Sequence, residues 1–359
     1  MKRTHQGILL SGFPTCRQFL SYALAASVAG CLALRATAQE DKLEISADAV
    51  PTNTVVATIP VGAGPQFVTI NSQDTFVYVV NSNNTVSAIN TATNKVIGTW
   101  SAGATPLGLA VTPDGTQLYV TSSTAAGAVT ILNASTGAVI KTIAVDGNPG
   151  FLQISPDGGS AFVPSDLTGT VTVIDTASQT IKTKISIGIN ADSVAFTPSG
   201  NFAYVTDPRG KEVAVIDTAT LTVSHVLRIH AATGYVAVNP AGTQDVFVLD
   251  GADAAGIPQQ ITVIKGDKVI KTLTIRDAHI GFFAITPNGK YAYVPDTYHG
   301  GAPYNYVRLL NTTTYNDVGK MIQVGNKPLG VAIAHNGAYA YVTNYQDNTV
   351  SVIKISPAQ

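Results

Sequence analysis

The chain has 359 residues, of which 45% are hydrophobic and 12% are charged, and its 32 glycines suit a globular protein with many turns. Four of its 21 basic residues and none of its acidic ones precede residue 39, so the remainder has 17 basic and 22 acidic residues, a net charge of −5. This balance argues against general nucleic-acid binding, whose affinity comes mainly from neutralising phosphates.

The N-terminal segment has the three parts of an export signal. The basic start MKRTHQ and Arg17 precede the apolar run FLSYALAASVAGCLAL, which is followed by Ala36-Thr37-Ala38. Small residues in an A-x-A pattern are typical of signal-peptide cleavage sites. We therefore expect residues 1–38 to be removed after Ala38 and the protein to be periplasmic or secreted. The 16-residue run is short for a bilayer span, which needs about 20 residues, so no transmembrane span is expected in the mature chain.

A lipoprotein is the alternative at the same place. Val28-Ala29-Gly30-Cys31 resembles a lipidation box, and Cys31 would then anchor the protein to a membrane. The only other cysteine is Cys16, so cleavage after Ala38 would leave no disulfide, thiolate metal site or cysteine nucleophile. Residues 39–53 are expected to be a flexible lead-in.

From residue 54 onward, a segment of 41 to 48 residues recurs seven times. Its marker is a quartet made of an aromatic residue, valine, a variable residue and a small polar residue. The quartets are Tyr78-Val79-Val80-Asn81, Tyr119-Val120-Thr121-Ser122, Phe162-Val163-Pro164-Ser165, Tyr204-Val205-Thr206-Asp207, Phe247-Val248-Leu249-Asp250, Tyr293-Val294-Pro295-Asp296 and Tyr341-Val342-Thr343-Asn344.

Each complete copy contains four short strand patterns. In the second copy, an apolar strand (107–112) leads through the turn Pro113-Asp114-Gly115 into the quartet strand. Proline presets φ and glycine permits positive φ, which suits a tight reversal. Two further strands follow in every copy except the last, as in 170–175 and 181–187. Four strands at this period are typical of a β-propeller blade, so residues 54–359 are predicted to form one all-β, seven-bladed propeller of four-stranded antiparallel blades, rather than a β-sandwich.

The quartets, above all Tyr341-Val342-Thr343-Asn344, resemble those of the YVTN-repeat propellers, which fall with the quinoprotein amine dehydrogenase β-chain-like propellers. The resemblance covers about residues 54 to 355. It implies a seven-bladed fold and fits export from a bacterial cell. It implies little about function, which depends on sites carried by the fold.

The last repeat lacks its outer strand, because the chain ends after residues 349–355. The stretch Thr54–Ile59 matches the outer strands of other repeats, such as 139–145 and 269–275. We therefore predict that Thr54–Ile59 pairs with Val350–Ile355 and closes the ring, which would also protect the sheet edges.

Two loops on the face that usually binds ligands are longer than the others. Residues 251–260 extend the loop of blade five, and residues 297–306 extend that of blade six. They suggest a wall over one sector of the channel mouth, with neutral loop drift as the alternative.

The quartets of blades four, five and six end in Asp207, Asp250 and Asp296. If the three carboxylates converge, they could hold a divalent cation such as calcium, the only cofactor suggested, or a cationic or polyol ligand. Alternatively, each side chain caps its own loop by hydrogen bonding to the backbone two residues on.

Other polar residues favour the same sector. His230 and His279 precede blades five and six, Tyr298 and His299 lie in the long loop of blade six, and Arg209 follows Asp207. Together they define a candidate ligand pocket, although no histidine pair has metal-ligand spacing. His335 is expected on the opposite face, in a tight turn, and His225 on an outer strand.

No enzyme motif stands out: the chain has no G-x-S-x-G elbow, Gly-rich phosphate loop or C-x-x-C-H haem site, and one tryptophan, Trp100. We therefore expect an exported binding or interaction module whose top face, over blades four to six, contacts a small molecule, a glycan or a protein. The alternative is a metal-assisted, lactonase-like hydrolase or lyase at the channel mouth, with catalytic residues unassigned. A surface-layer role is a third possibility. Convergence of the three aspartates would separate the first two.

Overall fold

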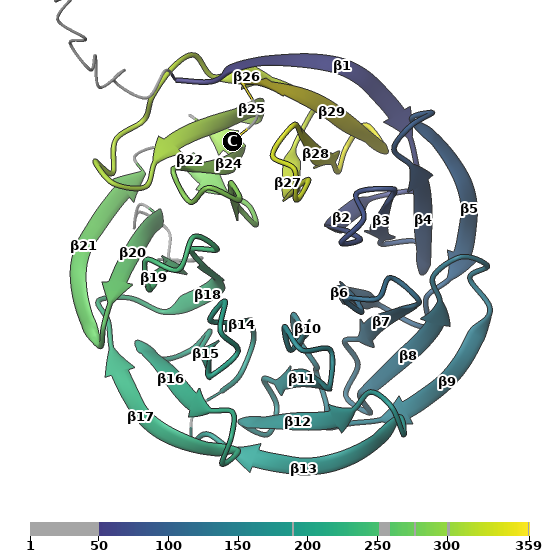
Figure 1. The fold of residues 1–359 in the computed structure, drawn as a ribbon, viewed down its shortest axis with the longest axis vertical. Coiled ribbons are helices and arrows are strands. Elements are labelled where there is room, and N and C mark those ends of the chain that lie inside the picture. Colours follow the sequence, from purple (N-terminus) through teal and green to yellow (C-terminus); the bar gives the residue numbers. More distant parts are fainter. Residues whose placement is uncertain (1–49, 189, 251–258, 276–277, 300–301, 358) are drawn as a thin grey trace, which may run out of the picture. The chain divides into compact units, whose positions relative to one another are not determined.

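The computed structural model describes residues 50–359 except 189, 251–258, 276–277, 300–301 and 358. The predicted signal peptide, the lipidation alternative at Cys31 and most of the lead-in therefore lie outside the described residues. Within them, strands form seven sheets arranged as a closed ring, so the predicted seven-bladed all-β propeller is confirmed (Figure 1). No helix in the described part of the chain is long and apolar enough to cross a membrane.

Each blade is an antiparallel sheet whose strands follow one another from the channel outward. Blades one to three consist of β2 (Pro65–Ile70), β3 (Phe76–Asn81), β4 (Thr85–Asn90), β5 (Lys95–Ser101); β6 (Pro106–Val111), β7 (Gln117–Ser122), β8 (Ala128–Asn133), β9 (Val139–Ala144); and β10 (Gln153–Ile154), β11 (Ser160–Ser165), β12 (Thr170–Asp175), β13 (Thr180–Ser186). Blades four and five consist of β14 (Val194–Phe196), β15 (Phe202–Thr206), β16 (Glu212–Asp217), β17 (Thr222–Arg228); and β18 (Thr233–Val238), β19 (Asp245–Asp250), β20 (Gln259–Lys265), β21 (Lys268–Ile275). Blades six and seven consist of β22 (Ala278–Ile280), β23 (Ala284–Ile285), β24 (Tyr291–His299), β25 (Ala302–Asn311), β26 (Ile322–Gln323); and β27 (Pro328–Ile333), β28 (Tyr339–Asn344), β29 (Thr349–Ser356), β1 (Thr52–Pro60).

The N-terminal strand completes blade seven as predicted. β1 pairs antiparallel with β29, with Ile59 opposite Val350 and Thr52 opposite Ser356. In Figure 1 the first and last strands of the coloured ribbon lie side by side at the rim. β1 begins at Thr52, two residues before the expected boundary at residue 54, because Thr52 and Asn53 continue the ladder to Ser356 and Ile355.

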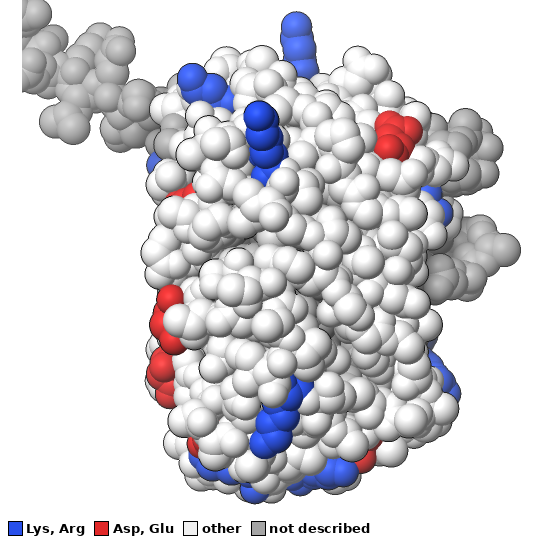
Figure 2. All heavy atoms as spheres, turned by 90° about the vertical axis from the view of Figure 1, so that its right-hand side faces the viewer, with Lys and Arg blue, Asp and Glu red and all other residues white. Residues whose placement is uncertain are grey.

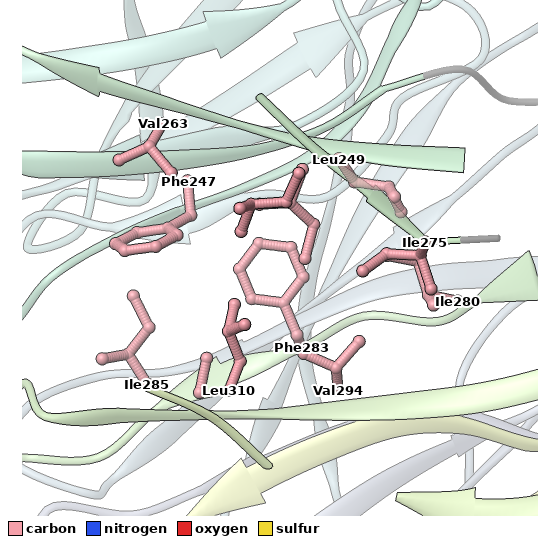
Figure 3. Packing of buried hydrophobic residues seen from close by; sticks show 12 residues of the cluster. Phe247, Leu249, Val263, Ile275, Ile280, Phe283, Ile285, Val294 and Leu310 are labelled. Carbon is pink, nitrogen blue, oxygen red and sulfur yellow. The ribbon is translucent and has the colours of Figure 1, made fainter. Parts of the chain in front are cut away.

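The quartet repeats because its alternate residues pack against two different neighbours. In blade one, Tyr78 belongs to the apolar cluster shared with blade two, whereas Val79 belongs to the cluster shared with blade seven. Successive side chains of a strand point to opposite faces of the sheet, so aromatic and valine positions each fill one inter-blade interface. Figure 3 shows one such interface, where Phe283 of blade six packs among side chains that include Phe247 and Leu249 of blade five.

The predicted tight turns are also present. Gly115 has a φ of 74°, a conformation that side chains other than glycine adopt rarely, and its N–H donates to the carbonyl of Thr112 at 2.8 Å. His335 occupies the same kind of turn in blade seven, as predicted, and bonds Asp74 of blade one at 2.9 Å. His225 lies on the outer strand β17, also as predicted, 2.9 Å from Asp267.

The third quartet residue joins neighbouring inner strands. In blade seven, the Thr343 hydroxyl accepts a hydrogen bond from Gly330 N–H and donates to the carbonyl of Gln66 in blade one, both at 2.8 Å. Thr121 makes the same bridge from blade two to Gly150 of blade three, and Thr206 makes it from blade four to blade five. Threonine at this position therefore links consecutive blades at the channel.

Where proline replaces this threonine, the backbone forms the link. In blade three, which carries Pro164, the N–H of Phe151 donates to the carbonyl of Asp192 in blade four at 2.7 Å. In blade six, which carries Pro295, the N–H of Phe282 donates to Leu329 of blade seven at 2.7 Å. In these five blades, threonine or proline at the third quartet position thus determines whether a side chain or the backbone joins a blade to the next one.

In blade six, the structure differs from the predicted loop extension. Residues 297–306 were expected to form a long loop, but β24 and β25 continue as a hairpin, with His299 paired to Ala302. Three tyrosines and Thr297 flank its two glycines, and tyrosine and threonine favour extended strands. β22 adds to the same hairpin, because Ala278 pairs with His299. In blade five, residues 251–258 of the predicted insertion lie outside the described residues.

Candidate functional site

We define the top face as the end of the ring that carries the connections from second to third strands and from outer strands to the next inner strand. The bottom face carries the other turns. Asp207, Asp250 and Asp296 all lie at the top ends of quartet strands, as expected. They do not form a group: across the residues that the structure describes, no cluster of three or more His, Cys, Asp or Glu could hold a metal ion.

Each of the three carboxylates has its own local partner. Asp207 Oδ1 accepts the backbone N–H of Arg209 at 2.9 Å, which is the loop-capping alternative considered above. Asp250 Oδ2 accepts the hydroxyl of Thr262 at 2.6 Å. Asp296 Oδ2 is 2.9 Å from both Nε and Nη2 of Arg308 on β25.

The Asp296–Arg308 pair is buried and closed. The Asp296 side chain is 0% exposed and that of Arg308 is 12% exposed, and Arg308 also contacts Asp317 at 3.1 Å. Burial alone would lower the pKa of Arg308, but the hydrogen bond and charge of Asp296 raise it. The guanidinium occupies the position beside Asp296 that a cationic ligand would need.

Asp250 is a buried carboxylate with an incomplete shell. Its Oδ1 has no hydrogen-bond partner within the described part of the chain, and desolvation raises the pKa of this carboxyl group, against the opposing effects of Thr262 and His230. His230 itself is exposed. Asp250 directly precedes residues 251–258, so its surroundings on that side lie outside the described residues.

Asp192, which the sequence analysis did not single out, is a further perturbed acid on the top face. It precedes β14, and its backbone is fixed at the seam of blades three and four, because its carbonyl accepts from Phe151 N–H and its N–H donates to the carbonyl of Thr206. Burial, together with the charge of Asp166, raises the pKa of Asp192 to about 7. Its carboxylate has neither a hydrogen bond nor a cationic partner among the described residues.

Asp166 and Arg209 complete this acidic site. Arg209 Nη2 lies 2.6 Å from Asp166 Oδ2, and the Arg209 side chain is 62% exposed. The other oxygen of Asp166, Oδ1, is buried without a hydrogen-bond partner in the described structure. The top seam of blades three and four therefore holds two carboxylates and one exposed guanidinium.

Gly150 allows the backbone carbonyl of Asp192 to approach closely, with its carboxylate beside it. A Cβ at position 150 would lie 2.0 Å from the backbone oxygen of Asp192 and 2.9 Å from its Oδ1, so no other residue fits without a shift. Gly150 and Asp192 occupy the same position in repeats three and four. The residues at this position in the other five repeats are all uncharged: Gln66, Leu107, Gly234, Gly281 and Leu329. A repeat alignment could therefore have identified Asp192 as the one charged residue in this ring.

Below these residues, four aromatic rings close the channel. Phe67, Phe151, Tyr235 and Phe282 come from blades one, three, five and six, and each ring centroid lies 4.5 to 6.1 Å from the other three. Rings from blades three and six can meet only across the axis, so these four side chains, which we call the aromatic plug, fill it. The equivalent residues of the remaining blades are Gly108, Ser193 and Gly330, which are small enough to leave that space.

The other predicted pocket residues are dispersed. His279 lies on β22, exposed, and its carbonyl accepts the Thr297 hydroxyl at 2.8 Å. Tyr298 and His299 belong to the end of β24, but the placement of their side chains lies outside what the structure describes. The structure thus brings Arg209 to Asp166 and His230 toward Asp250, and leaves Asp296 with Arg308.

Charges are sparse on the flank of the ring. Figure 2 shows the side that carries β5 and β9, where Lys, Arg, Asp and Glu are scattered over a mainly uncharged surface. Neither sign forms a continuous patch on this side.

Comparisons with known proteins identify the fold and nothing finer. No protein-family model and no curated protein matches this sequence. Among solved structures, the chain is similar to a hydrazine synthase chain from Kuenenia stuttgartiensis, with a TM-score of 0.72 and 22% identity over 82% of this chain and 96% of that one. It is also similar to the β-propeller domain of Cps50 (Swd1) from Myceliophteria thermophila, with a TM-score of 0.71 and 10% identity over 85% of this chain and 100% of that one. At these identities the likeness shows the propeller fold alone.

Proposed function

We propose that this protein is an exported binding module that recognises a cationic group at the top seam of blades three and four. The observation that carries the proposal is the Asp192 carboxylate, which is held at the channel mouth beside Asp166 and has no cationic partner among the described residues. A ligand ammonium group or a divalent cation would supply the missing positive charge. The site therefore lies at the edge of the sector over blades four to six that is expected from the sequence.

Asp192 and Asp166 have different roles in this proposal. Asp166 is already paired with Arg209, whose exposed side chain can move to accommodate a ligand. Asp192 is the open position, and its carboxyl group changes charge near neutral pH. Binding of a cation should therefore be weak below pH 7, where Asp192 is protonated, and stronger above it.

Export and membership of the YVTN-repeat group are part of the same proposal. The A-x-A pattern ending at Ala38 supports export to the periplasm or medium, with lipidation at Cys31 as the alternative. The bridging roles of Thr121, Thr206 and Thr343 give the Tyr-Val-Thr pattern a physical reason, which supports the resemblance.

A hydrolase remains the second candidate, and Asp192 is also the residue that favours it. A carboxylate with a pKa near 7 suits a general base. The lactonase-like alternative requires a bound metal, but in the described part of the chain no group of three or more His, Cys, Asp or Glu could hold one. We therefore rank binding first. Calcium-dependent hydrolysis of lactones that is lost in Asp192→Asn would reverse this order.

The test is a thermal-shift titration of the chain beginning at Gln39, with calcium chloride, putrescine, choline and ethanolamine as probes, at pH 6 and pH 8. A ligand that binds only the folded state raises the melting temperature. We expect at least one probe to do so more strongly at pH 8 than at pH 6, and Asp192→Asn to remove the difference. Asp217→Asn, in an exposed turn at the bottom face, is the matched control. Shifts that are equal at both pH values, or unchanged in Asp192→Asn, would contradict the proposal.

A further inference from the structure

A cavity lies on the bottom-face side of the aromatic plug. It has a volume of about 350 Å³ and is lined mainly by the inner strands of blades one, two, three and seven, β2, β6, β10 and β27 (Figure 1). Phe67 and Tyr235 of the plug lie at its inner end, and its rim is formed by bottom-face turn residues that include Pro113, Pro156 and His335. This volume falls in the range of small-molecule sites.

Three polar side chains of this cavity lack partners. The Thr69 hydroxyl, the Gln153 amide and the Tyr235 hydroxyl line it, and none of them makes a side-chain hydrogen bond to any described residue. By contrast, Thr112 and Ser155 at the rim are bonded to Asp114 and Asp157. The unused groups come from three different blades, so they can contact one molecule from several directions.

Tyr235 is the innermost of the three. It packs against Phe67, Phe151 and Phe282 at centroid distances of 5.4 to 6.1 Å. Burial raises the pKa of Tyr235 to about 12, so its hydroxyl keeps its proton at neutral pH. It can therefore donate a hydrogen bond to a ligand oxygen while its ring contributes an apolar surface.

The lining carries no strong charge. It contains no Lys, Arg, Asp or Glu, and its one ionisable group other than Tyr235 is His335 at the rim, which is 2.9 Å from Asp74. The remaining surface is mostly aliphatic, from residues such as Val111, Ile154 and Ile333. A charged ligand would lose its hydration here without gaining a counter-charge.

We propose that this cavity binds a neutral, monosaccharide-sized polyol that enters from the bottom face. Its hydroxyl groups would bond Thr69, Gln153 and Tyr235, and its C–H surface would lie against Phe67 and the aliphatic lining. Two small side chains in its lining leave space for such a ligand: Ala110 and Ala332 stand where blade three has Gln153. This site is separate from the top seam and does not depend on the proposed function.

The experiment uses the chain beginning at Gln39 and follows side-chain amide and backbone resonances by NMR during titration with D-glucose, D-galactose, D-xylose and myo-inositol. D-glucuronate, which adds a carboxylate, is the charged comparison. We expect saturable shifts of the Gln153 side-chain amide with at least one neutral probe, and weaker binding of D-glucuronate.

Three variants test the contacts. Gln153→Ala and Tyr235→Phe should each weaken binding by about two- to tenfold, the usual effect of one hydrogen bond. Ala110→Leu should abolish binding by filling the cavity. Gln346→Ala, an exposed top-face substitution, should change nothing. Unchanged backbone spectra of Tyr235→Phe would show that its ring still folds in place.

Absence of saturable shifts with all four neutral probes would overturn the proposal. So would binding that survives Gln153→Ala and Tyr235→Phe unchanged, or tighter binding of D-glucuronate than of the neutral probes. Because Gln153→Ala, Tyr235→Phe and Ala110→Leu alter no top-face residue, the outcome is independent of Asp192.

Discussion

Asp296 and Arg308 occupy, in blade six, the positions of a neutral pair in blades one and seven. There, Asn81 bonds Ser87 at 3.0 Å and Asn344 bonds Ser351 at 2.9 Å between the second and third strands. In blade six the same two strands are joined by a buried ion pair. A buried ion pair can often be replaced by neutral groups, whereas removal of one partner leaves an uncompensated charge.

This comparison predicts the effects of two variants. Arg308→Ser alone should lower the free energy of unfolding by about 3–5 kcal/mol, because the Asp296 carboxylate stays buried without its guanidinium. Asp296→Asn combined with Arg308→Ser recreates the pair of blades one and seven and should recover most of the loss. Urea unfolding of both variants at pH 7 measures the difference.

The pH dependence of stability is a control for the role of the Asp296 charge. The single variant should regain stability as pH falls, because a buried carboxyl group with a raised pKa favours folding when it is protonated. Equal losses in the single and double variants, or a loss in the single variant that does not depend on pH, would show that packing rather than charge is responsible.

At this scale the sequence predicts positions better than contacts. It places Asp207, Asp250 and Asp296 at one end of the ring, but their partners Arg209 N–H, Thr262 and Arg308 depend on how each side chain turns. Asp192 escapes notice because it lies outside the quartet, and because burial, which no motif encodes, is what perturbs it.

The N-terminal strand β1 shows how one element divides its two faces between core and solvent. Ile59 is 2% exposed and belongs to the apolar cluster between blades seven and one, whereas Val56 is 49% exposed. Ile59→Ala should therefore lower the free energy of unfolding by about 2–5 kcal/mol, as expected for truncation of a buried isoleucine.

Val56→Ala, in the same strand, is the matched control and should change stability by no more than about 0.5 kcal/mol. Guanidinium unfolding of both variants tests whether β1 is an integral part of the fold. If Ile59→Ala is as mild as Val56→Ala, β1 does not hold the ring closed in solution.

The strands could be predicted from the sequence because the strand pattern recurs in seven copies, so a weak pattern in one copy can be recognised from the others. The exceptions are local. Residues 297–306 were interpreted as a loop insertion, but they lengthen the existing hairpin of β24 and β25, whose pairing continues to His299 and Ala302. β1 extends two residues beyond its expected start because the partner strand β29 is long enough to pair with Thr52 and Asn53.

At the scale of the whole molecule, the ring is closed by strands from opposite ends of the chain. Thr343 adds a second link across the same junction by donating to Gln66. A chain that begins at Val61 should lose this closure and expose the edge of β29, so it should unfold at a lower temperature and aggregate.

A synthetic peptide of residues 50–60, added in excess, should restore the melting temperature by pairing with β29. A peptide with the same composition in scrambled order is the control. No rescue, or equal rescue by both peptides, would argue against sequence-specific closure.

The number of blades has a consequence for symmetry. Large and small residues cannot alternate strictly around a ring with an odd number of members. With aromatic residues in blades one, three, five and six, two large rings, Tyr235 and Phe282, must come from adjacent sectors. The plug is therefore lopsided, and the void beneath it is bordered mainly by the sectors from seven to three. A molecule bound there would have one preferred orientation instead of seven equivalent ones. A protein with a nearly repetitive sequence can therefore still bind stereoselectively.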